Sequence, residues 1–203
     1  MRHKNGGTLS QPSMASSIDT PDWSTIPAPK DDGEARHLPG KTLASIDLPA
    51  TDGSKVNLAK LRGCVVVYAY PRTGRPGVKN LEGWDMIPGA RGCTPQTCAF
   101  RDHFAELSDA GVAHLFGLST QSPAYQREVA ERLHLPFAIL SDDHLQLTRA
   151  MRFPTFEAGG MTLLKRFTLI VRDGIVEHVF YPVFPPDRNA EEVLEWLKSH
   201  RST

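Results

Sequence analysis

The chain has 203 residues, of which 40% are hydrophobic, and it carries 23 basic (Lys and Arg) and 23 acidic (Asp and Glu) residues. This length predicts one domain with extensions, long enough to bury a core. The balanced charge gives no reason to expect a nucleic acid or a membrane surface as a partner. No run of residues approaches the ~18 apolar residues that cross a bilayer.

Residues 1–40 are rich in Pro, Asp, Ser and Gly and have little hydrophobic periodicity, so we interpret them as a flexible N-terminal arm. The first 17 residues are polar and lack the apolar stretch of a signal peptide. Three cysteines, an odd number, do not fit a secreted disulfide scaffold. We therefore expect a cytoplasmic location, where thiols stay reduced.

The remaining residues, 41–203, alternate between strand and helix patterns. Two short alternating segments around a turn at 51–54 predict a hairpin over 44–58. The continuous apolar run at 64–70 predicts a central strand buried on both faces, with Cys64 in the core. Further strands are expected at 112–119, 136–140, 166–171 and 175–180, and helices at 123–133, 144–151 and 190–200. This order predicts an α/β domain with a mixed central sheet.

Cys93 and Cys98 lie where the first long strand gives way to a helix. Thr94 suits the N-cap of this helix and Pro95 its first position. Cys93 then lies at the helix N-terminus, where partial positive charge favours thiolate over thiol, and Cys98 lies about one turn further on. This arrangement predicts redox chemistry, although a buried cysteine is also a common small core residue.

A structural zinc site would need two further ligands beside these cysteines. His103 and His114 do not have the spacing that such sites use, so we expect no metal.

Several short motifs in this chain resemble those of the peroxiredoxins, most closely the bacterioferritin-comigratory protein or peroxiredoxin Q branch. The resemblance covers about residues 40–200. It is carried by Tyr70-Pro71, Gly92-Cys93-Thr94, Cys98, Phe100-Arg101-Asp102, Leu140-Ser141-Asp142 and Lys165-Arg166.

The resemblance implies a thioredoxin-like fold, a central mixed β-sheet flanked by helices, with an N-terminal β-hairpin. It also implies a thiol peroxidase that reduces hydrogen peroxide and organic hydroperoxides without a cofactor. Cys93 would become a sulfenic acid, Cys98 would convert it to an intramolecular disulfide, and a thioredoxin- or glutaredoxin-type reductant would recycle the enzyme. Arg166 would stabilise the thiolate and polarise the peroxide, unless it is an ordinary surface strand residue, and Pro71 would shield the thiolate from water. A monomer or weak homodimer is expected.

The chain departs from the family pattern Pro-x-x-x-Thr/Ser-x-x-Cys. Counting from Pro71, Val78 stands where the cysteine is expected, so residues 78–92 form an insertion. Thr73 is the hydroxyl residue nearest to the Thr/Ser position of the family pattern. It either positions the peroxide or makes a turn with Gly74. The insertion either forms a lid or docking surface at the cysteine pocket, or packs Trp84 onto the domain.

Two other functions remain compatible with the sequence. One is a thiol-disulfide oxidoreductase, although such enzymes usually carry Cys-x-x-Cys rather than the spacing of Cys93 and Cys98. The other is a non-catalytic thioredoxin-like binding or chaperone module in which the insertion has disabled peroxide chemistry.

Overall fold

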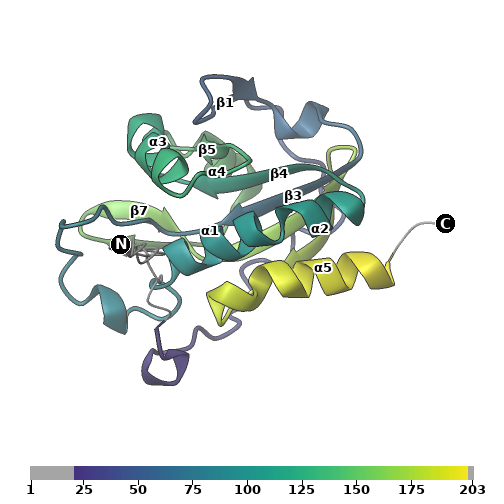
Figure 1. Ribbon diagram of the computed structural model, residues 1–203. Coiled ribbons are helices and arrows are strands. Elements are labelled where there is room, and N and C mark those ends of the chain that lie inside the picture. Colours follow the sequence, from purple (N-terminus) through teal and green to yellow (C-terminus); the bar gives the residue numbers. More distant parts are fainter. Residues whose placement is uncertain (1–20, 201–203) are drawn as a thin grey trace, which may run out of the picture.

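The computed structural model describes residues 21–200 and contains a five-stranded mixed sheet in the order β5-β4-β3-β8-β9 (Figure 1). Its strands are β3 (Cys64–Ala69), β4 (Val112–Ser119), β5 (Ile139–Ser141), β8 (Phe167–Arg172) and β9 (Ile175–Phe180). Two small hairpins join it, β1 (Leu48–Pro49) with β2 (Lys55–Val56) and β6 (Thr155–Ala158) with β7 (Met161–Leu164). The mixed α/β architecture expected from the sequence is therefore confirmed.

Helices cover both faces of this sheet. The α-helices are α1 (Cys93–Asp102), α2 (Phe104–Asp109), α3 (Pro123–Arg132), α4 (Gln146–Met151) and α5 (Asn189–Ser199), and the 3₁₀ helices are η1 (Trp23–Thr25), η2 (Leu58–Lys60), η3 (Trp84–Met86) and η4 (Pro186–Arg188). In Figure 1, α1, α2 and α5 cross the front of the sheet. Their apolar residues form one core with alternate β3 residues such as Val66 and Tyr68, while Val65 and Val67 belong to a second core with α4.

Strand β3 decides where the functional residues meet. It pairs parallel to β4 and antiparallel to β8, with Ala69 opposite Phe167. The residues that follow β3 and β4 therefore lie at the same sheet edge as the residue that precedes β8, which is Arg166. Open α/β sheets place their sites at the carboxyl ends of the parallel strands, and this is the edge where α1 begins.

The predicted strand at 112–119 has the bounds of β4, and the strands at 64–70 and 175–180 agree with β3 and β9 to within one residue. The expected start of the cysteine helix is wrong. Gly92, not Thr94, is the N-cap, in the left-handed region at φ 102°, and Cys93 is itself the first helical residue. The carbonyl of Gly92 accepts the first helical hydrogen bond from the amide of Gln96 at 3.0 Å.

Two further differences concern hairpins. The expected N-terminal hairpin forms, but its paired strands are only β1 and β2, and Leu58 begins η2 instead of ending a strand. The β6–β7 hairpin was not expected from the sequence. Its four-residue strands flank Gly159-Gly160, and polar and apolar residues alternate in Thr155–Ala158, so the sequence does carry a two-residue hairpin signal here.

The proposed flexible arm, residues 1–40, falls only partly within the described residues. Residues 21–40 lie against the domain, and Ala35 and Leu38 are buried in the core that includes α4. The amide of Gly40 donates to Val176 on the edge strand β9 at 2.7 Å. The flexibility of the arm stays a prediction, but its second half is fixed to the domain by these contacts.

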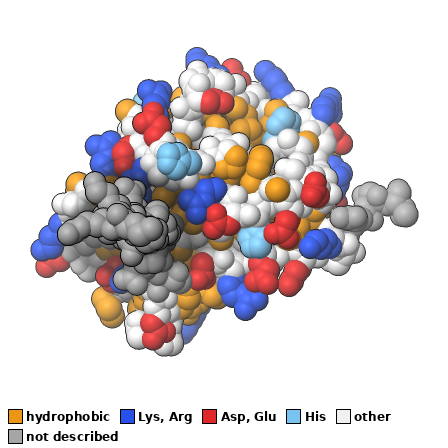
Figure 2. All heavy atoms as spheres, viewed as in Figure 1, with side chains coloured by type: hydrophobic (Ala, Val, Ile, Leu, Met, Phe, Trp, Pro, Cys, Tyr) orange, Lys and Arg blue, Asp and Glu red, His pale blue; other side chains and the backbone are white. Residues whose placement is uncertain are grey.

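Acidic and basic side chains are interspersed over the face shown in Figure 2, as the balanced composition leads one to expect. Within residues 21–200, no helix is both long and apolar enough to cross a membrane.

Candidate active site

Cys93 occupies the first turn of α1, at the carboxyl edge of β3. Its side chain is only 3% exposed, and its Sγ lies 3.6 Å from the carbonyl oxygen of Ala90. The helix N-terminus contributes partial positive charge at this position. The thiol is thus held in a buried, electropositive site.

Arg166 lies directly beside this thiol. Its Nη2 is 3.3 Å from Cys93 Sγ and donates to the carbonyl oxygens of Gly89, Ala90 and Arg91 at 3.1–3.3 Å. The side chain is 3% exposed, so the interpretation of Arg166 as a surface strand residue is wrong. The guanidinium therefore fixes the end of the insertion and brings a permanent positive charge to the sulfur.

A buried network behind Arg166 holds the guanidinium in place. Arg166 Nη1 donates to Gln96 Oε1 at 2.5 Å, and Gln96 Nε2 donates to Asn189 Oδ1 at 3.0 Å. Thr168 Oγ1 donates to the same Asn189 oxygen at 2.6 Å. Gln96 and Asn189 are absent from the residues expected from the sequence. The signal that could have found Gln96 is its position three residues after Cys93, on the first turn of the same helix.

Thr73 and Pro71 are both buried in the loop that follows β3. Thr73 lines a cavity of about 280 Å³ together with Cys93, Pro95, Trp84 and Pro21. Gln121, which follows β4, holds it there, because the Gln121 side chain accepts from the Thr73 amide at 2.9 Å and donates to its carbonyl at 3.0 Å. The structure therefore brings Thr73 and Cys93 to one cavity and places Pro71 at the end of β3.

Cys98 and Cys64 are free, buried thiols like Cys93. Cys98 lies within α1 and is 5% exposed, and burial raises the pKa of its thiol. Cys64 begins β3 and is a core residue, as expected, and burial raises the pKa of its thiol as well. A thiol with a raised pKa stays protonated near neutral pH, so both are poor nucleophiles in this conformation.

The insertion packs against the β6–β7 hairpin. Trp84 is 4% exposed and forms a small core with Ala90 and Leu163, against which Phe156 also packs. The guanidinium of Arg72 lies 5.9 Å from the Trp84 ring centroid. The expectation that Trp84 packs onto the domain is met, and the same residue also lines the Cys93 cavity.

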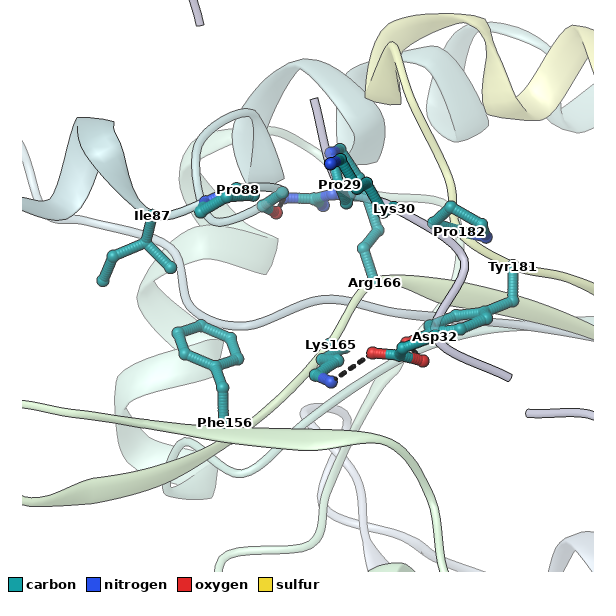
Figure 3. Close-up of a pocket in the computed structure, with 11 residues that line it drawn as sticks. Pro29, Lys30, Asp32, Ile87, Pro88, Phe156, Lys165, Arg166, Tyr181 and Pro182 are labelled. Carbon is teal, nitrogen blue, oxygen red and sulfur yellow. Dashed lines mark hydrogen bonds and ion pairs between the residues drawn. The ribbon is translucent and has the colours of Figure 1, made fainter. Parts of the chain in front are cut away.

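A second cavity, of about 240 Å³, lies on another side of Arg166 (Figure 3). Ile87 and Phe156 line one side of it, and Tyr181 and Asp32 line the other. Asp32 accepts from Lys165 Nζ and from the Tyr181 hydroxyl, each at 2.6 Å. This ion pair ties the segment before residue 40 to the residue next to Arg166.

Residues 21–200 contain no group of three or more His, Cys, Asp or Glu side chains placed to hold a metal ion. What the site does bring together is a buried thiol and a guanidinium, 3.3 Å apart.

Three kinds of comparison show which known proteins this chain is similar to. The family model described as Redoxin matches residues 35–194. The chain is 32% identical to the chloroplastic peroxiredoxin Q of Sedum lineare, over 92% of this chain and 90% of that protein. It is also 32% identical to peroxiredoxin Bcp of Escherichia coli strain K12, over 79% of this chain and 96% of that protein.

Among solved structures, the crystal structure of peroxidoxin BcpB from Mycobacterium tuberculosis superposes with a TM-score of 0.66 at 26% identity. The match covers 82% of this chain and all of that one. With the thioredoxin-like fold, the family match and the relatives in agreement, the chain belongs to the redoxin family and is a peroxiredoxin of the Q/Bcp type, a thiol-dependent peroxidase.

Proposed function

We propose that Cys93 is the residue that attacks the peroxide, and that Arg166 and Thr73 act with it. The observation that carries this proposal is the 3.3 Å approach of Arg166 Nη2 to Cys93 Sγ at the N-terminus of α1. The Cys93 thiolate attacks one peroxide oxygen, the O–O bond breaks, and the other oxygen leaves as water or an alcohol after taking a proton. The sulfur is left as a sulfenic acid.

Arg166 stabilises charge on both partners of this reaction. A guanidinium stays charged at any working pH and offers several donors in fixed directions, so it can face both the thiolate and the departing oxygen. Gln96 and the carbonyls of residues 89–91 keep it aligned before substrate arrives. Thr73 is the hydroxyl that shares the cavity with Cys93, and we assign it the contact with the second peroxide oxygen.

Cys98 is proposed to resolve the sulfenic acid. Its thiolate attacks the Cys93 sulfur, water leaves, and an intramolecular disulfide forms. A thioredoxin- or glutaredoxin-type dithiol then returns both cysteines to thiols. The substrates are hydrogen peroxide and organic hydroperoxides, the reaction takes place in the cytoplasm, and the protein is a monomer or a weak homodimer.

A coupled assay tests this proposal. The wild type should consume peroxide with a thioredoxin system, Cys93→Ser should lose this activity, and Cys64→Ser should keep it because Cys64 is a core residue of β3. Disulfide reduction without peroxide consumption would identify a thiol-disulfide oxidoreductase. A Cys93→Ser variant that still consumes peroxide and reduces disulfides would contradict the role assigned to Cys93. A wild type with neither activity would favour a binding module.

A further inference from the structure

Trp23 lies against the start of the cysteine helix. A Cβ atom built on Gly92 would lie 2.7 Å from Cη2 of Trp23 and would overlap Cγ of Pro186. Gly92, the residue immediately before Cys93, is thus enclosed between an indole ring from η1 and a proline from η4. No larger residue fits at this position without moving one of them.

Trp23 is fixed on its far side to the segment that leads into α5. Its Nε1 donates to Asp187 Oδ2 at 2.9 Å, across 164 residues of sequence. Its ring meets Phe184 edge to face, with centroids 6.1 Å apart and planes at 77°. The indole therefore connects the N-terminal segment to η4 across the first turn of α1.

Disulfide formation requires this first turn to move. Both cysteines are helical, and five residues of helix separate them by about 7.5 Å of rise and about 140° of rotation. A disulfide needs Cα atoms within ~7 Å and converging Cβ atoms. The helix between the two cysteines must therefore unwind, and its first residue directly follows Gly92, which Trp23 and Pro186 enclose.

We propose that Trp23 is a positioning residue that holds the first turn of α1 folded and so slows the step in which Cys98 resolves the Cys93 sulfenic acid. This inference rests on the proposed roles of Cys93 and Cys98. In the step itself, the sulfenic acid and the Cys98 thiol give a disulfide and water. A second peroxide competes by oxidising the sulfenic acid to a sulfinic acid, with release of water or an alcohol.

Single-turnover kinetics of the reduced full-length protein test the role of Trp23. After one equivalent of hydrogen peroxide, quenched samples are analysed by mass for sulfenic acid and disulfide. Trp23→Ala should speed disulfide formation about tenfold, which corresponds to about 1.4 kcal/mol and is the size expected for one aromatic contact and one hydrogen bond. Sulfenic acid formation should change less than disulfide formation, and excess peroxide should give less sulfinic acid.

Two milder variants each remove the hydrogen bond between Trp23 Nε1 and Asp187 Oδ2. Trp23→Phe and Asp187→Ala should each speed disulfide formation by a similar, smaller factor, about threefold, and the double variant should add little, because both remove one interaction. Trp196→Ala is the matched control, since Trp196 lies on α5 and stacks on His178 and His200 instead. It should leave the disulfide rate unchanged.

The outcomes separate the two proposals. A disulfide that forms at the same rate in wild type, Trp23→Ala and Trp23→Phe would overturn the role of Trp23 and leave that of Cys98 intact. A wild type in which no Cys93–Cys98 disulfide forms would overturn the proposed role of Cys98 and, with it, this inference.

Discussion

Arg166 contacts the Cys93 thiol, the insertion and Gln96, and this makes it more than a charge beside a thiol. Its Nη2 contacts Cys93 Sγ and three carbonyl oxygens of the insertion, while its Nη1 is taken up by Gln96. Those bonds fix the guanidinium in a buried site, where hydrogen bonds to charged groups are strong. The sulfur and the insertion therefore share one guanidinium, which holds residues 89–91 beside the thiol.

We predict that Arg166→Met slows sulfenic acid formation at Cys93 about 10²-fold, the usual cost of removing one donor aimed at developing charge. Stopped-flow measurement of the first oxidation step checks this. Arg172→Met is the matched control, because Arg172 ends β8, the strand that Arg166 precedes, and pairs with Glu177 at the surface. Equal rates in the two variants would return Arg166 to a structural role.

At the scale of elements, α1 carries both proposed reaction partners in one continuous helix. The two buried thiols cannot meet without unwinding it, so the reduced and disulfide forms must differ near its start. Opening of this kind also exposes Cys98, removing the burial that raises its pKa. A local opening therefore both brings Cys98 within reach and makes it a better nucleophile.

Hydrogen exchange should report this opening. The amides of residues 96–98 are expected to exchange faster in the disulfide form than in the dithiol form, because their helical hydrogen bonds, such as that from Gln96 to Gly92, are lost. In Cys98→Ser, a dimedone-type probe should trap the Cys93 sulfenic acid. Equal exchange in both redox forms, with the disulfide verified by mass, would contradict the unwinding of α1.

Trp84 packs the insertion against the β6–β7 hairpin, and its truncation has a measurable cost in stability. Trp84→Ala should lower the free energy of unfolding by about 3–5 kcal/mol, as expected when a buried aromatic is truncated. Denaturant unfolding, together with amide protection of β6 and β7, measures it. Met86→Ala in the same η3 is the control, since Met86 is 70% exposed, and a similar loss in both variants would argue against the packing role.

At the scale of the whole molecule, residues 21–40 pack against the domain and reach the cavity beside Cys93. This N-terminal segment contributes Leu38 to one core, Trp23 to the start of α1, and Pro21 to the Cys93 cavity. Asp32 binds Lys165, the neighbour of Arg166. Partial burial raises the pKa of Asp32, but the hydrogen bonds from Lys165 and Tyr181 outweigh this effect and hold it at about 2.

This lowered pKa predicts a pH dependence of stability. A carboxyl whose pKa lies near 3.9 in the unfolded chain and about 2 in the folded one stabilises the fold fully above the unfolded value and loses that contribution as the pH falls toward 2. The melting temperature of wild type should therefore exceed that of Asp32→Asn at pH 6, and the difference should shrink between about pH 4 and pH 2. A difference that stays constant over this range would show that the ion pair does not anchor the segment.

Features that depend only on neighbouring residues could be predicted from the sequence. The apolar run at 64–70 predicts a strand buried on both faces because every second residue faces the same side and all of them are apolar. Two cysteines near the start of a helix predict redox chemistry, because the helix N-terminus favours the thiolate and the spacing is visible in the sequence. Even so, the helix begins at Cys93 and not at Pro95, because Gly92 and not Thr94 is its N-cap.

Tertiary structure alone decided what surrounds the thiol. Arg166 reaches Cys93 because β8 runs antiparallel to β3, and strand order cannot be read from periodicity. Gln96, Asn189 and Trp23 join the site through contacts across 70 to 164 residues of sequence, and no local pattern encodes such distances. The sequence thus determined which chemistry is possible, whereas the long-range packing determined which side chains are placed to perform it.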